Sequence, residues 1–125
     1  MRKIGLTLLL AALPLCSVNA QAMPVSQFLA KADALQKKGA MALFSSDIGK
    51  LKAEVVNSGK QLRAEQIAAQ KAGRKVGYCM PERKKSSVTS NEVLGHFRSI
   101  PAAERNMPVK AAFAGLMRKK YPCRG

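Results

Sequence analysis

Apolar side chains recur every three or four residues through most of the chain, which is the spacing of amphipathic α-helices. The pattern predicts four main helices, at residues 26–38, 48–72, 90–100 and 108–120. A short apolar stretch at residues 40–44 is expected to form one turn or a short helix that fills the core. The alternation of apolar and polar residues that marks a half-buried strand is absent from the sequence. The expected fold class is therefore all-α, a small bundle of four main helices plus a short one.

Capping residues mark the ends of these helices. Ser26 is expected to be the N-cap of the first helix and Gly39 its C-cap. Thr89, followed three residues later by Glu92, fits a capping box at the start of the third main helix. Gly59 interrupts the long second pattern, where a glycine costs about 1 kcal/mol relative to alanine. It marks either a kink or the close approach of another helix.

Residues 1–22 have the pattern of a secretory signal peptide. Basic Arg2 and Lys3 precede an apolar run of about a dozen residues, the usual length for a signal peptide and too short for a membrane span. Small residues allow cleavage after Ala20 or after Ala22. We therefore expect export to the periplasm, with residues 23–125 forming a single helical domain.

Lipidation at Cys16 is the alternative reading of this leader. A lipoprotein signal requires a small residue just before the modified cysteine, whereas Leu15 is bulky. Cleavage that leaves no lipid is therefore the preferred prediction.

Cys79 and Cys123 are the two cysteines that remain after the leader is removed. A disulfide is the default state of such a pair in an oxidising compartment. It would close a loop of about 45 residues, for which the chain-entropy model gives roughly 4 kcal/mol. The alternatives are two free thiols or a metal site, but two cysteines and the single His96 are too few ligands for a closed zinc site. We expect the disulfide to join the outer ends of an antiparallel pair formed by the last two helices.

The chain is strongly basic, with a net charge of +15 of which Arg2 and Lys3 in the leader supply two. Such a balance favours an acidic partner, whether a protein, an anionic membrane surface or nucleic acid. Nucleic acid is disfavoured by the leader and by the lack of aromatic residues interleaved with the basic ones. A protein partner with an acidic surface is therefore the first expectation.

A basic run follows the first of the two cysteines and is the most suggestive surface feature. Loops anchored by a rigid scaffold are common sites of binding, although a solvated loop that only maintains solubility would look the same. The candidate partner-binding loop consists of Met80, Pro81, Glu82, Arg83, Lys84 and Lys85.

Nothing in the sequence marks a catalytic or metal site. The single histidine, His96, falls on a predicted helix, and the seven carboxylates are scattered along the chain. No nucleophile elbow, phosphate-binding loop or zinc-protease motif is present. We expect a protein that is not an enzyme and that needs no cofactor.

Four short motifs resemble the Rap/Tai family of small periplasmic immunity proteins. They are V-S-Q-F-L-A-K-A-D-A-L (Val25 to Leu35), A-L-F-S-S-D-I-G-K-L-K (Ala42 to Lys52), Y-C-M-P (Tyr78 to Pro81) and K-Y-P-C (Lys120 to Cys123). Their order covers nearly the whole chain after the leader. The cysteines and prolines of the last two motifs carry over position by position, namely Cys79, Pro81, Pro122 and Cys123.

The resemblance implies an all-α fold, a structural disulfide and, in many members, a homodimer. It also implies a role in which the protein binds a type VI-secreted peptidoglycan amidase and blocks its catalytic cleft. Met80 stands where many members have a proline, and the charge is unusually high for the family. The alternative is a periplasmic stress or holdase-like protein, similar in size and single-disulfide plan to acid chaperones of the Hde type. The low carboxylate count argues against pH-triggered unfolding of that kind.

Overall fold

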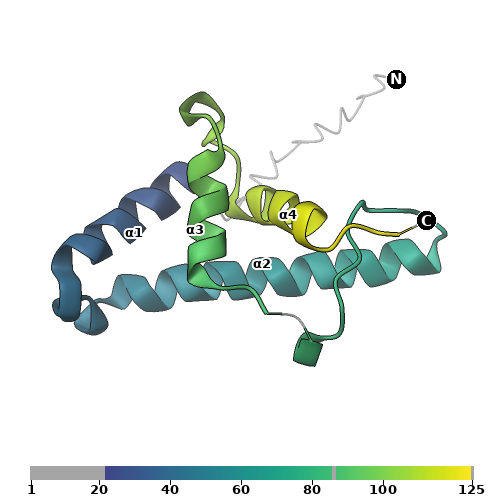
Figure 1. The fold of residues 1–125 in the computed structure, drawn as a ribbon, viewed down its shortest axis with the longest axis horizontal. Helices are drawn as coiled ribbons and strands as arrows, with labels where there is room; N and C mark the ends of the chain where they lie inside the picture. The colour runs from purple at the N-terminus through teal and green to yellow at the C-terminus, as the bar shows by residue number, and fades with distance from the viewer. Residues whose placement is uncertain (1–21, 86, 125) are drawn as a thin grey trace, which may run out of the picture.

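The computed structural model describes residues 22–85 and 87–124, and it is helical (Figure 1). Four α-helices carry the fold: α1 (Val25–Lys38), α2 (Ser46–Lys71), α3 (Ser90–Ser99) and α4 (Val109–Lys120). Three 3₁₀ turns join them: η1 (Gly39–Phe44), η2 (Arg83–Lys85) and η3 (Ala102–Glu104). Within the described residues the only β contact is an isolated bridge between Pro24 and Pro108. The all-α prediction is confirmed, whereas the predicted leader lies outside the described residues except for Ala22.

The long helix α2 is the platform on which α1 and α4 pack, and α3 packs against α1 and α4. Figure 1 shows α1 folding back over the first half of α2, α4 crossing the middle of α2, and α3 standing steeply beside α1 and α4. The core lies where they meet, and its largest fully buried side chains are Val25, Phe97, Val109 and Met117. Phe28 of α1 meets Phe97 of α3 edge-on, with ring centroids 5.2 Å apart. In the part of the chain that the structure describes, no helix has both the length and the apolar character needed to cross a bilayer.

The start of α1 differs from the prediction, because Ser26 is not its N-cap. The cap position is Pro24, which offers no side-chain hydrogen bond. Instead, the backbone N–H groups of Val25 and Ser26 donate to the carbonyl oxygens of Met107 and Arg105, at 3.0 and 2.9 Å. Free N–H groups at a helix start need a partner, and here the backbone leading into α4 supplies it.

Gly59 lies inside an uninterrupted α2, so the close-approach reading of this glycine is confirmed and the kink reading is wrong. A Cβ placed on Gly59 would lie 3.6 Å from the ring of Phe113 on α4. That distance is ordinary van der Waals contact, so a Cβ would fit at this position. Gly59 therefore lies where α4 crosses α2, but the crossing does not require a glycine.

The apolar stretch at residues 40–44 does not fill the core, contrary to the prediction. Met41, Leu43 and Phe44 are 67, 80 and 84% exposed. Gly39 has a φ of 55°, which ends α1 and turns the chain outward into η1. The turn lies at the end of the α1–α2 hairpin, away from α3 and α4 (Figure 1).

The disulfide between Cys79 and Cys123 is confirmed, with Cα atoms 5.0 Å apart and a sequence separation of 44. The antiparallel pairing that we expected for the last two helices is wrong. In Figure 1, α3 and α4 cross steeply and do not run side by side as an antiparallel pair. The bridge joins the segment that follows α2 to the segment that follows α4. Beside it, the N–H of Cys79 donates to the carbonyl oxygen of Tyr121 at 2.8 Å.

Candidate partner-binding site

The segment between α2 and the basic run is held against α2 by buried hydrogen bonds. The Met80 N–H donates to Oε1 of Gln66 at 2.8 Å, and the Gln66 amide nitrogen donates back to the Met80 carbonyl at 3.2 Å. Two residues earlier, the Tyr78 hydroxyl donates to the Leu62 carbonyl at 3.3 Å. Burial raises the pKa of Tyr78, so its hydroxyl stays protonated and able to donate. These hydrogen bonds between side chains and backbone hold residues 78–80 against α2.

Arg63 extends this attachment to the start of the predicted binding loop. Its guanidinium donates to the Pro81 carbonyl at 2.6 Å, so a cation lies directly beside the loop. Beyond Pro81 the chain forms the turn η2, in which the Lys85 N–H donates to the Glu82 carbonyl at 2.8 Å. Residues 82–85 are all exposed, and we call them the basic turn.

The predicted loop thus divides into an anchor and an exposed part. Met80 is only 8% exposed and belongs to the core cluster, so its main role is to fix the loop. Pro81 is half-buried. The side chains presented to solvent are Glu82, Arg83, Lys84 and Lys85.

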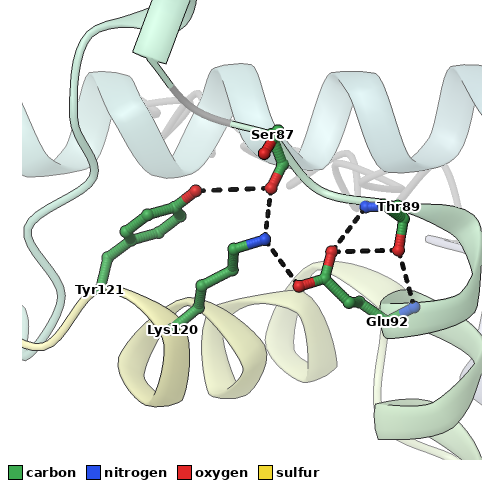
Figure 2. A network of polar contacts seen from close by, with 5 residues as sticks. All are labelled: Ser87, Thr89, Glu92, Lys120 and Tyr121. Carbon is green, nitrogen blue, oxygen red and sulfur yellow. Dashed lines mark hydrogen bonds and ion pairs between the residues drawn. The ribbon is translucent and has the colours of Figure 1, made fainter.

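A second network fixes the chain after the basic turn (Figure 2). Lys120, at the end of α4, donates to the Ser87 carbonyl and forms an ion pair with Glu92 at 2.6 Å. Glu92 in turn accepts from the N–H of Thr89 at 2.7 Å, and the Glu92 N–H donates to the Thr89 hydroxyl at 3.2 Å. This is the predicted capping box. The Tyr121 hydroxyl adds a 3.5 Å contact to the Ser87 carbonyl.

The hydrogen-bond donors of this network stabilise the charged form of Glu92. The hydrogen bond from Lys120 above all, followed by that from the Thr89 backbone, lowers the pKa of Glu92 to about 2. The carboxylate is therefore charged at any physiological pH. The network ties α4 to the start of α3 across the end of the loop, so the basic turn is anchored on both sides.

A pocket of about 330 Å³ lies beneath the loop, between α2 and α4. Its floor is apolar and includes Phe113 and Met117, while Lys60, Arg63 and Arg83 bring cations to its wall. The remaining lining residues are Val56, Gly59, Met80, Val88 and Tyr121. Such a surface suits an apolar side chain carried on an acidic segment of a partner.

His96 lies apart from this pocket, on the contact between α3 and α4. A Cβ on Gly115 would lie 3.1 Å from its Nε2 atom, so the glycine makes room for the imidazole. Burial, with a smaller effect of Lys119, lowers the pKa of His96. Among residues 22–85 and 87–124, no group of three His, Cys, Asp or Glu side chains is placed to hold a metal ion.

Sequence reasoning identified the basic turn, the disulfide and the capping box but missed three residues that fix the loop. Arg63 and Lys120 looked like ordinary helix-surface cations. Gln66 did carry a signal, since it lies four residues after Leu62 and three before Ala69, on the apolar stripe of α2. A polar residue in a buried stripe requires a hydrogen-bond partner, and the loop backbone is that partner.

Comparisons of the chain with family models, with curated proteins and with solved structures give no match. The resemblance to the Rap/Tai family therefore depends on the four sequence motifs and stays a prediction.

Proposed function

We propose that the chain is a binding protein that captures an acidic partner protein through the basic turn and the pocket beneath it. The observation that carries the proposal is the double anchoring of the loop. Gln66 and the disulfide hold one end, and the Lys120–Glu92 pair holds the other. A recognition element that is fixed before binding loses little conformational entropy when the partner arrives.

Charge supports the same role. The net charge of +15, or +13 once Arg2 and Lys3 of the predicted leader are removed, draws an acidic partner toward the protein. Complementary charge raises the association rate more than it raises the affinity itself. Association should therefore slow as salt concentration increases.

The resemblance to Rap/Tai proteins makes a type VI-secreted peptidoglycan amidase the first partner to test. In this proposal the chain acts in the periplasm, and the basic turn occludes the cleft in which the amidase binds its substrate. Inhibition by occlusion requires shape and charge from the inhibitor and no catalytic group, so the protein is proposed not to be an enzyme.

Capture of candidate amidases by the oxidised protein, at low and at physiological salt, tests the proposal together with residual amidase activity. The matched variants are Arg83→Ala/Lys84→Ala/Lys85→Ala in the basic turn and Lys71→Ala/Arg74→Ala/Lys75→Ala at and just after the end of α2. Both remove three exposed cations. The first should slow association by about tenfold or more and the second by about twofold or less. Equal effects of the two variants would contradict the proposal, because they would mean that the overall charge attracts the partner and that the basic turn has no special role.

A periplasmic holdase-like role is the second candidate, and an apolar groove favours it. The groove, of about 580 Å³, lies between α1, α2 and α3 and is lined by Leu35, Ile48, Val55 and Leu94 among others. In this reading the groove holds exposed apolar segments of unfolding clients. Ile48→Asp, at a half-buried position that lines the groove and not the pocket beneath the basic turn, should then abolish suppression of client aggregation, whereas it should leave amidase capture unchanged if the first proposal holds.

A further inference from the structure

Three large apolar side chains protrude from the turn η1, and they are the most exposed ones in the described chain. Met41, Leu43 and Phe44 are 67, 80 and 84% exposed, against 45% for Val56 and 47% for Ile67. We call these three residues the apolar tip. Scattered single apolar residues are normal on a protein surface, but a cluster marks an interaction site.

The tip is held in its protruding conformation by the chain on both sides of it. Gly39 caps α1, and its N–H donates to the Gln36 carbonyl. At the other end the Ser45 N–H donates to the Ala42 carbonyl at 2.9 Å, and its hydroxyl caps α2 by accepting from Asp47. The apolar side chains are therefore presented by a closed turn at the end of a helical hairpin.

Lysines flank the tip along the chain on both sides, and the carboxylates of this end of the hairpin are already engaged. Lys37 and Lys38 lie in the last turn of α1, and Lys50 and Lys52 lie in the first turns of α2. The two carboxylates of this end of the hairpin are both in ion pairs.

Asp33 pairs with Arg98 at 2.8 Å, and Asp47 pairs with Lys31 at 3.1 Å and more distantly with Lys50 at 3.8 Å. The hydrogen bond from Lys31 lowers the pKa of Asp47. The surroundings of the tip therefore carry an excess of positive charge.

We infer that the apolar tip docks the protein onto a bilayer surface that contains anionic phospholipid. Apolar side chains that enter the boundary between head groups and acyl chains, with cations around them that reach the phosphates, are the two ingredients of interfacial binding. Lysine suits this position because its alkyl stem lies along apolar surface while its ammonium stays in water.

The convex shape of the tip favours a bilayer over a folded protein as its partner. A protein would need separate cavities for three protruding side chains, whereas a bilayer deforms around them. Figure 1 shows η1 at one end of α2, with η2 closer to its middle. Docking by the tip therefore leaves the basic turn accessible, and the inference does not depend on the proposed function.

Fluorescence of a single tryptophan tests insertion directly, because the natural chain contains none. Phe44→Trp places the probe in the tip, and Ile67→Trp places it at a similarly apolar but remote position on α2. The protein is isolated as the cell produces it, with its N-terminus read by mass spectrometry. Each variant is titrated with vesicles of phosphatidylglycerol and phosphatidylcholine, and with vesicles of phosphatidylcholine alone. The emission of Phe44→Trp should shift to the blue on the anionic vesicles, and that of Ile67→Trp should not.

Partition measured by vesicle flotation adds matched controls. Leu43→Ser/Phe44→Ser should lower the partition coefficient by about tenfold or more, and Ile67→Ser should not lower it. Lys37→Gln/Lys38→Gln should lower it by roughly tenfold on anionic vesicles. Lys71→Gln/Lys75→Gln should change it by about twofold or less, because the far end of a helix of this length lies well beyond the Debye length of about 8 Å.

Two results would overturn the inference. Binding to anionic vesicles without a blue shift, and unchanged by Leu43→Ser/Phe44→Ser, would mean adsorption by overall charge. No vesicle binding, with loss of a protein partner in the same double variant, would mean that the tip is a protein-docking surface.

Discussion

The two connections that flank α2 differ both in what fixes them and in what they expose. The turn η1 before α2 is held by the ends of the helices that it joins, and it exposes Met41, Leu43 and Phe44. The connection after α2 is held by a disulfide, a buried glutamine and an ion pair, and its exposed part is charged. Fixing a long connection requires contacts from elsewhere in the fold, whereas a short turn between two helices needs only its caps.

This difference implies that substitutions in the second connection should affect stability, whereas those in η1 should not. The largest effect is expected from the disulfide. Cys79→Ser/Cys123→Ser should lower the free energy of unfolding by roughly 2–4 kcal/mol, because the bridge restricts the unfolded chain. Denaturant unfolding of the oxidised protein and of the variant gives this difference. An unchanged midpoint would contradict the stabilising role assigned to the bridge.

The buried glutamine should come next. Gln66→Ala leaves the Met80 N–H and carbonyl without their partners, which should cost roughly 1–3 kcal/mol. Phe44→Ser in the apolar tip is the contrasting variant, and an exposed substitution of this kind should stay within about 0.5 kcal/mol of the natural chain. Thermal unfolding compares the two. A larger loss from Phe44→Ser than from Gln66→Ala would reverse the comparison between the connections.

The smallest effect is expected from pH. The pKa of Glu92 is about 2 in the folded chain against 4.5 for the free side chain. A depressed pKa contributes stability that is fully present above the unfolded value and is lost as pH falls through the folded one. The midpoint difference between the natural chain and Glu92→Gln should therefore be greatest near neutral pH and should shrink from about pH 4.5 toward pH 2.

Asp47 beside the tip provides the counterpart, because the hydrogen bond from Lys31 lowers its pKa as well. Asp47→Asn should show the same direction of pH dependence. A midpoint difference that grows on acidification, in either variant, would contradict the ion pairs that the structure contains.

Much of the fold follows from local sequence. Helical periodicity predicted four helices, and the spacing of Thr89 and Glu92 predicted the capping box that is observed. The local sequence pattern did not reveal which elements pack against each other. The cap of α1 comes from the backbone at Arg105 and Met107, and no pattern in residues 24–28 encodes that contact.

The error at η1 has a similar origin. An apolar composition predicts burial only where another element reaches the segment, and α4 packs farther along α2. For the candidate site, the charge run and the first cysteine predicted where the loop lies. The anchors Arg63 and Lys120 could not be predicted, because their partners are backbone carbonyls and a carboxylate brought close only by folding.

Amide hydrogen exchange of the oxidised protein, alone and bound to a captured amidase, compares the two connections in one measurement. We expect new protection in peptides that cover residues 80–89, while peptides that cover residues 39–44 exchange as in the free protein. Protection of residues 39–44 with no change in residues 80–89 would contradict the assignment of the basic turn as the partner-binding site.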